Sequence, residues 1–129
     1  MEINASLAGM GVVLTLKKRA QYLAVYERGK AWADGLVVVK ALPNGLWFSQ
    51  YGFSVSKRVG KAVVRNRVRR LLKEVVRLAP IKSGWDIVFV ARPVAATADY
   101  HQLKRSVEKL LARADLLREK DEVAGNRAN

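Results

Sequence analysis

Hydrophobic residues recur along this chain with a helical period in some segments and an alternating period in others. Residues 61–78 carry the clearest helical stripe, with apolar side chains on one side and mostly basic ones on the other. Its apolar members are Val64, Val68, Leu71, Leu72 and Val75. A second stripe, in residues 98–118, consists of Leu103, Val107, Leu110, Leu111 and Ala114. Asp99 and Gln102 have the spacing of a capping box, so we predict a helix in both segments.

Three further segments complete the predicted secondary structure. Residues 16–29 predict a basic lead-in and a short helix, in which Tyr22, Val25 and Tyr26 share one face and Gly29 marks the end. Residues 35–42 and 46–56 are apolar or alternating and flank the turn signal Pro43-Asn44-Gly45, so they predict a hairpin. Residues 86–92 predict a buried strand.

The order helix, strand, strand, helix, strand, helix predicts a small α+β fold. We expect a two-layer α/β sandwich, with three helices on a small central sheet that contains the hairpin. The length of 129 residues fits one domain, which we place at residues 16–118. Residues 1–15 are expected to form a flexible N-terminal extension, and residues 119–129 a disordered tail.

The positive charge is concentrated rather than spread along the chain. The formal net charge is +13, and residues 57–77 hold nine of the 24 Lys and Arg but only one acid, Glu74. Such a cluster favours a binding face for a polyanion, with nucleic acid ahead of an anionic membrane surface. No stretch approaches the roughly 18 apolar residues of a membrane span, so no membrane partner is expected.

The sequence offers no catalytic constellation. There is no cysteine and a single histidine, His101, which excludes thiol chemistry and multi-histidine metal sites. The carboxylates lie in different predicted elements, without the spacing of a two-metal nuclease. We therefore predict a binding protein with no catalytic residue and no cofactor of its own.

Residues 53–74 closely resemble the signature of the bacterial ribonuclease P protein subunit, whose centre is Arg65-Asn66-Arg67. Residues 16–19, 22–29, 42–45 and 86–92 also resemble that family, so the similarity covers roughly residues 16–117. The resemblance implies a left-handed βαβ crossover around the basic helix. Most parallel crossovers are right-handed, so pattern alone would not predict it.

The resemblance also implies the function of a cytoplasmic accessory subunit in an endoribonuclease. In that family the RNA subunit cleaves precursor tRNA with metal-bound water, and the protein binds both this RNA and the single-stranded 5′ leader. Magnesium would be held mainly by the partner RNA, and one protein copy would act in the holoenzyme. The RNA-binding residues would be Lys57, Arg58, Lys61, Arg65, Asn66, Arg67, Arg69, Arg70 and Lys73. The leader groove would be lined by Tyr22, Tyr26, Lys40 and Phe53.

The sequence leaves several assignments open. Tyr22 and Tyr26 stand where the family usually carries phenylalanine, and Lys40 where many members carry an aromatic residue. Tyrosines at this spacing serve either as core residues or as a stacking platform for unpaired bases, and Phe53 could equally lie in the core. The main alternative function is a general RNA-binding or ribosomal-type protein that uses the same basic helix. A DNA-binding domain and an autonomous metal-dependent nuclease fit less well.

Overall fold

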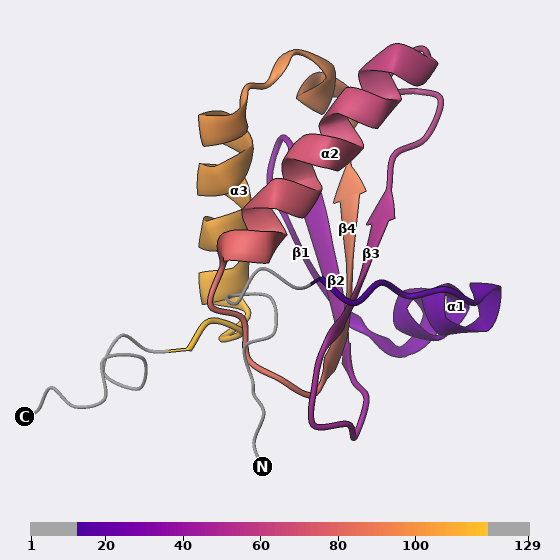
Figure 1. Ribbon diagram of the computed structural model, residues 1–129, viewed down its shortest axis with the longest axis vertical. Helices are drawn as coiled ribbons and strands as arrows, with labels where there is room; N and C mark the ends of the chain where they lie inside the picture. The colour runs from indigo at the N-terminus through magenta and orange to yellow at the C-terminus, as the bar shows by residue number, and fades with distance from the viewer. Residues whose placement is uncertain (1–12, 119–129) are drawn as a thin grey trace, which may run out of the picture.

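The computed structural model describes residues 13–118, which form a four-stranded sheet and three α-helices (Figure 1). In chain order the elements are α1 (Arg19–Arg28), β1 (Lys30–Ala33), β2 (Val37–Pro43), β3 (Gln50–Ser54), α2 (Ala62–Leu78), β4 (Trp85–Ala91), the 3-10 helix η1 (Pro93–Thr97) and α3 (Tyr100–Arg113). The predicted α+β class and the three helices are confirmed. Within this part of the chain, no helix has the length and apolar character needed to cross a membrane.

The sheet has the order β1-β2-β4-β3, so the predicted hairpin between residues 35–42 and 46–56 is wrong. β4 lies between β2 and β3, antiparallel to β2 and parallel to β3. Ile87, Val88 and Phe89 of β4 are all fully buried, and a strand that is apolar on both faces belongs in the centre of a sheet. The hairpin that does form joins β2 to the short strand β1, which the sequence pattern did not predict.

The connection from β3 through α2 to β4 is a left-handed crossover. In Figure 1, α2 crosses in front of the sheet, β3 and β4 both run upward, and β4 lies to the left of β3. A right-handed connection would place the second strand on the other side, and it is the form found in most proteins. The expectation drawn from the family resemblance is therefore confirmed.

The main core lies between the sheet and the helices α2 and α3. Val68, Leu72 and Val75 of the predicted α2 stripe are buried there, and Val64 and Leu71 pack at its edge. Four residues of the predicted α3 stripe are fully buried: Leu103, Val107, Leu110 and Leu111. The fifth, Ala114, is half-buried. Both helices therefore pack through the faces that their periodicity predicts.

A second, smaller core lies on the opposite face of the sheet, beneath α1. Leu16, Val25 of α1 and Val88 of β4 are buried there. Neighbouring residues of a strand point to opposite faces, so Val88 meets α1 while Phe89 meets the main core. The two-layer sandwich thus carries α1 as a partial cover on its other face.

Two predicted boundaries need correction. Leu14 and Leu16 pair with Tyr51 of β3 through backbone hydrogen bonds of 2.8 Å, so the folded part begins before residue 16. This pairing occupies the outer edge of β3, whose backbone groups would otherwise lack partners. The last helix ends at Arg113 rather than at residue 118, because the chain turns at Asp115 (φ 59°) and Leu117 then bridges Ile81. Residues 1–12 and the predicted tail at 119–129 lie outside the described residues.

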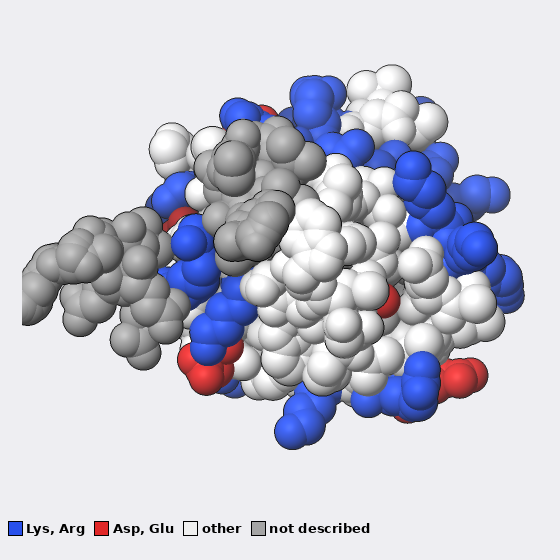
Figure 2. Space-filling model, turned by 60° about the horizontal axis from the view of Figure 1, so that its bottom comes forward, with Lys and Arg blue, Asp and Glu red and all other residues white. Residues whose placement is uncertain are grey.

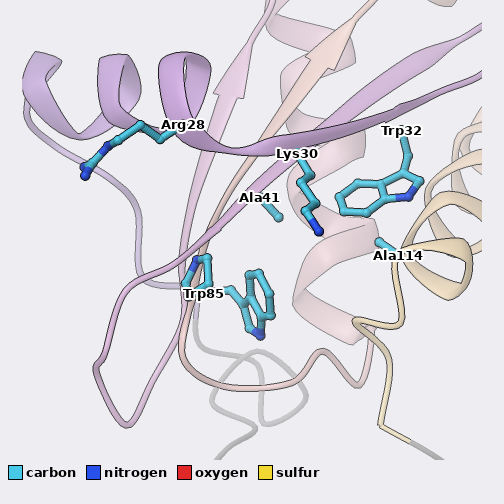
Figure 3. A pocket seen from close by; sticks show the side chains of 7 residues that line it. Arg28, Lys30, Trp32, Ala41, Trp85 and Ala114 are labelled. Atoms are coloured by element: carbon cyan, nitrogen blue, oxygen red, sulfur yellow. The ribbon is translucent and has the colours of Figure 1, made fainter.

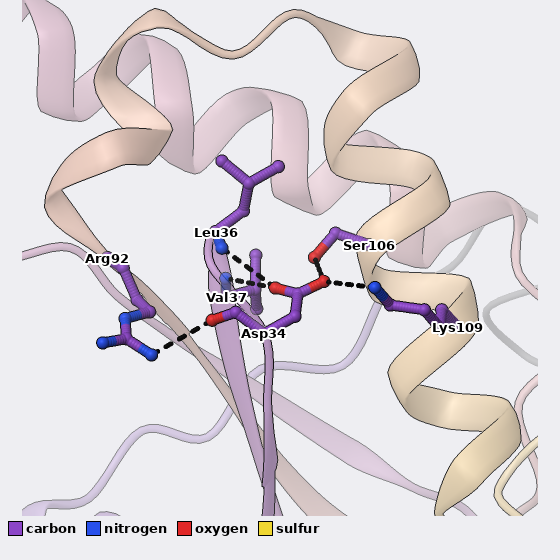
Figure 4. A network of polar contacts seen from close by, with 6 residues as sticks. All are labelled: Asp34, Leu36, Val37, Arg92, Ser106 and Lys109. Carbon is purple, nitrogen blue, oxygen red and sulfur yellow. Dashed lines mark hydrogen bonds and ion pairs between the residues drawn. The ribbon is translucent and has the colours of Figure 1, made fainter.

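Asp34 lies in the turn that connects β1 to β2, and its side chain ties this turn to α3 (Figure 4). Its Oδ1 accepts the backbone N–H groups of Leu36 (2.9 Å) and Val37 (3.0 Å), and its Oδ2 accepts the Ser106 hydroxyl (2.6 Å). Lys109 Nζ lies 3.3 Å from the same Oδ2. Burial alone would raise the pKa of this carboxyl, but the hydrogen bonds outweigh burial and hold the pKa below its usual value.

Replacing Asp34 by asparagine should lower the free energy of unfolding by about 2 kcal/mol at neutral pH, because a charged acceptor is lost. The folded-state pKa is the lower one, so this stabilisation is complete above the unfolded-state pKa and is lost as pH falls through the folded-state pKa. The difference between the wild type and Asp34→Asn should therefore shrink below about pH 4. Denaturant titrations across this pH range measure it.

Asp115→Asn is the matched control for this experiment. The Asp115 side chain is 88% exposed and pairs only at the surface with Lys82, and asparagine tolerates the positive φ at this position. Its effect should be small at every pH. An Asp34→Asn protein as stable as the wild type at neutral pH would contradict the role of this carboxylate.

Candidate RNA interface

The outer face of α2 carries the most concentrated positive charge in the described structure. Asn66, Arg69, Arg70 and Lys73 fall at helical spacings that place them side by side, and together they line a shallow hollow of about 240 Å³. Farther along the helix, Arg77 binds Glu74 through two hydrogen bonds, one of 3.0 Å from Nε to Oε1. The single acid of this helix therefore neutralises its C-terminal end and leaves the preceding turns positive.

The loop before α2 presents three more cations. Val59 N–H donates to the carbonyl of Ser56 (3.0 Å) and Gly60 N–H to that of Lys57 (3.2 Å), so two successive turns fix the backbone. The side chains of Lys57, Arg58 and Lys61 are exposed on this loop. No acidic partner for them is found within residues 13–118. Loop and helix together present a run of positive side chains, which we name the α2 basic face. It consists of Lys57, Arg58, Lys61, Arg69, Arg70 and Lys73.

The structure divides the Arg65-Asn66-Arg67 motif between two roles. Arg67 donates from Nη1 to the carbonyl of Ala96 (3.3 Å) and from Nη2 to that of Ala98 (2.7 Å). Arg65 Nε donates to the carbonyl of Gly60 (3.1 Å). These two guanidinium groups connect α2 to the segment before α3 and to the basic loop.

Asn66 is the exposed member of the motif. Its Oδ1 accepts a hydrogen bond of 3.0 Å from Arg69 Nη1, so it orients that guanidinium on the α2 basic face. In this structure Arg67, predicted to neutralise a phosphate, is instead held by carbonyl groups of the protein. The exposed candidates for phosphate contact are therefore Lys57, Arg58, Lys61, Arg70 and Lys73, with Arg69 half-exposed beside them.

Arg67→Ala should lower the free energy of unfolding by about 2 kcal/mol, because the carbonyls of Ala96 and Ala98 lose a charged donor. Arg69→Ala is the matched control on the same helix, and it should leave stability almost unchanged because Arg69 bonds only to an exposed side chain. Thermal and denaturant unfolding of both variants would measure the difference. Equal stability of the two variants would contradict the structural role of Arg67.

The opposite face of the sheet carries an aromatic surface beside α1. Tyr22 and Tyr26 are one helical turn apart, and Lys40 of β2 places its Nζ 4.9 Å from the centroid of the Tyr26 ring. Tyr26 is 38% exposed, whereas Tyr22 is partly buried against the small core. These three residues, which the family resemblance assigns to the leader groove, lie on one surface; we name it the α1 aromatic surface.

Gly52 allows the Tyr22 ring to lie on β3. A Cβ atom at Gly52 would be only 2.5 Å from Tyr22 Cε1, so any larger residue would displace the ring. Gly52 is not among the site residues predicted from the sequence. The alternation of β3 is its only sequence signal, because Tyr51 and Phe53 point to one face and Gly52 to the other.

Phe53 does not belong to the α1 aromatic surface, so its assignment to the leader groove is wrong. Its ring stacks on Phe89 with centroids 5.7 Å apart and 16° between the planes, on the α2 side of the sheet. The strand alternation that brings Gly52 to Tyr22 turns Phe53 into the main core. The alternative of a core residue is the correct one.

Comparison with known proteins agrees with this geometry. The model of the Ribonuclease P family matches residues 10–115. The ribonuclease P protein component of Caldanaerobacter subterraneus subsp. tengcongensis is 49% identical over 108 residues, covering 82% of this chain and 93% of the relative. The ribonuclease P protein component of Dehalococcoides mccartyi (strain CBDB1) is 47% identical over 107 residues, covering 83% of this chain and 89% of the relative.

Solved structures show the same fold. The RNase P protein of Staphylococcus aureus superposes with a TM-score of 0.74 at 30% identity, covering 82% of this chain and 99% of that one. The RNase P protein from Thermotoga maritima gives a TM-score of 0.71 at 28% identity, covering 77% of this chain and 96% of that one. Sequence and structure agree over almost the whole described part, and on this evidence the chain belongs to the ribonuclease P protein component family, with a role in an endoribonuclease complex that processes tRNA.

Proposed function

We propose that the α2 basic face binds the RNA subunit of ribonuclease P while the α1 aromatic surface binds the single-stranded 5′ leader of precursor tRNA. The observation that carries this proposal is the placement of the two surfaces on opposite faces of one thin sheet. Each surface has the chemistry for its ligand. Exposed lysines and arginines neutralise phosphates, whereas aromatic rings stack on unpaired bases of any sequence.

The excess of positive charge across a whole face of the molecule also supports an RNA partner. On the face shown in Figure 2, Lys and Arg side chains far outnumber Asp and Glu, and they border a broad uncharged area. A small protein with this excess attracts a polyanion over several ångströms before any contact forms. In the proposed complex, one copy of the protein holds both RNAs.

In the proposed complex, the hydrolytic chemistry lies in the RNA subunit. Within residues 13–118 no three His, Cys, Asp or Glu side chains lie close enough to hold a metal ion together. Magnesium would supply the activated water of the hydrolysis while bound by RNA phosphates. The residues of this chain would bind and orient: the α2 basic face positions the catalytic RNA, and Tyr22, Tyr26 and Lys40 hold the leader.

Site-specific crosslinking tests both assignments at once. The natural chain has no cysteine, so Lys73→Cys and Tyr26→Cys would each carry one thiol-linked photoreactive group. In the assembled holoenzyme with precursor tRNA, the probe at position 73 should crosslink to the RNA subunit and the probe at position 26 to leader nucleotides. Arg105→Cys, on the exposed side of α3, is the matched control. Crosslinks from position 26 that do not depend on the leader would overturn the second assignment.

A further inference from the structure

A cavity of about 240 Å³ opens at one end of the sheet, on the face away from the α1 aromatic surface (Figure 3). Trp32 of β1 and Trp85 of β4 line it, and both also pack against the main core. Lys30, Ala41, Pro43 and Ala114 complete most of its wall. We name this cavity the indole pocket; neither surface of the proposed function includes it.

The strand register explains why the pocket exists. Lys30 pairs with Ala41 and Trp32 with Val39, while Trp85 pairs with Pro43 across the β2–β4 ladder. Alternate residues of β1 share one face, so Lys30 and Trp32 project to the same side. Ala41 on the sheet and Ala114 after α3 have small side chains, so the space between the two indoles stays open.

The residues around the pocket combine planar aromatic surface with two exposed cations, Lys30 and, at the margin, Arg28. In Figure 3, Trp32 and Trp85 lie on two sides of the cavity and the Lys30 side chain reaches between them, whereas Arg28 extends away at the margin. Lys30 is exposed, and no acidic side chain of the described residues lines the cavity. The pocket therefore offers stacking surface and positive charge at the same place.

These properties select the class of ligand. The volume lies below the roughly 300–1,000 Å³ of pockets for drug-sized molecules, so it suits a single ring system. Indole faces stack on planar heterocycles, and an ammonium group beside them favours a ligand that also carries negative charge. A nucleobase joined to a phosphate combines both features. We propose that the indole pocket binds one unpaired nucleotide, with its base against Trp32 and Trp85 and its phosphate at Lys30.

Tryptophan fluorescence of the isolated full-length protein tests this proposal. The chain has three tryptophans, and Trp47→Phe removes the one that does not line the pocket, so the remaining signal reports on Trp32 and Trp85. Adenosine 5′-monophosphate should quench this signal saturably, whereas inorganic phosphate at equal ionic strength should not. Adenosine should bind about fivefold more weakly than the monophosphate, because it lacks the phosphate that pairs with the exposed Lys30.

Two variants in the Trp47→Phe background locate the binding site. Ala114→Leu should fill the cavity and abolish the quenching, and melting curves would show whether this variant folds. Lys30→Gln should weaken binding of the monophosphate about fivefold, because one exposed ion pair is lost, and leave binding of adenosine unchanged. Any of three results would overturn the proposal. They are the absence of saturable quenching, an Ala114→Leu protein that folds and still binds the monophosphate, and a Lys30→Gln protein whose affinity for both ligands is unchanged.

A tetranucleotide distinguishes the two sources of such a ligand. If a single-stranded tetranucleotide quenches the same tryptophans at lower concentration than the monophosphate, and Ala114→Leu abolishes this, the pocket holds a nucleotide of an RNA strand. Equal affinities would identify a site for free nucleotides. This experiment uses no RNA subunit and no tRNA, so its outcome is independent of the proposed function.

Discussion

Replacing Arg69, Arg70 and Lys73 together by glutamine should weaken binding of ribonuclease P RNA about a hundredfold at near-physiological salt. Each neutralised phosphate releases condensed counterions, and this release is worth about fivefold in affinity per contact under those conditions. The three side chains line one hollow of the α2 basic face, and none packs in the core. The variant should therefore fold normally and lose affinity only.

The salt dependence of binding measures how many contacts are lost. With six to eight phosphates neutralised, a plot of log affinity against log salt concentration should have a slope of roughly −4 to −7 for the wild type. The triple variant should reduce the magnitude of this slope by about two to three.

Lys104→Gln, Arg105→Gln and Arg113→Gln together form the control. This variant removes the same net charge from α3, where Lys104 makes only a surface pair with Glu108. It should change affinity much less. Equal losses from the two triple variants would show that total charge, rather than the α2 basic face, determines binding.

Tyr22→Ala should weaken binding of leader-bearing precursor tRNA to the holoenzyme by about 1–3 kcal/mol, and binding of mature tRNA much less. The reason is the loss of a ring on which an unpaired base can stack. Tyr22→Phe should preserve the affinity because it keeps the ring. Equal losses for the two tRNAs would return Tyr22 to a purely structural role.

Gly52→Ala provides a second variant that leaves Tyr22 itself unchanged. Its added Cβ atom would displace the Tyr22 ring from the sheet, so leader affinity should fall although both tyrosines remain. Melting temperatures of both variants would separate a loss of binding from a loss of folding. The paired result therefore tests the position of the ring as well as its presence.

Local sequence patterns predict the helices of this protein well and the pairing of its strands poorly. The α2 and α3 stripes and the cap at Asp99 depend on residues within a few turns, so they are visible in the sequence. The insertion of β4 between β2 and β3 depends on contacts between distant segments. β1 has only four residues, three of them exposed, and carries no alternating pattern that would reveal it.

The candidate interface shows the same limit. The family resemblance groups Phe53 with Tyr22, Tyr26 and Lys40, whereas the phase of β3, which the sequence could not give, turns Phe53 inward. The role of Arg67 was equally hidden, because its acceptors lie 29 and 31 residues away along the chain. Asp34 likewise depends on Ser106, 72 residues away. Each of these side chains has partners that only the tertiary structure brings near.

Reconstituted cleavage tests the central claim most directly. The protein would be mixed with a bacterial ribonuclease P RNA and a 5′-extended precursor tRNA at low magnesium, beside controls with protein alone and RNA alone. Cleavage at the mature 5′ end should depend on the protein, and the protein alone should not cleave. Tight binding of the RNA without any stimulation of cleavage, or cleavage by the protein alone, would contradict it.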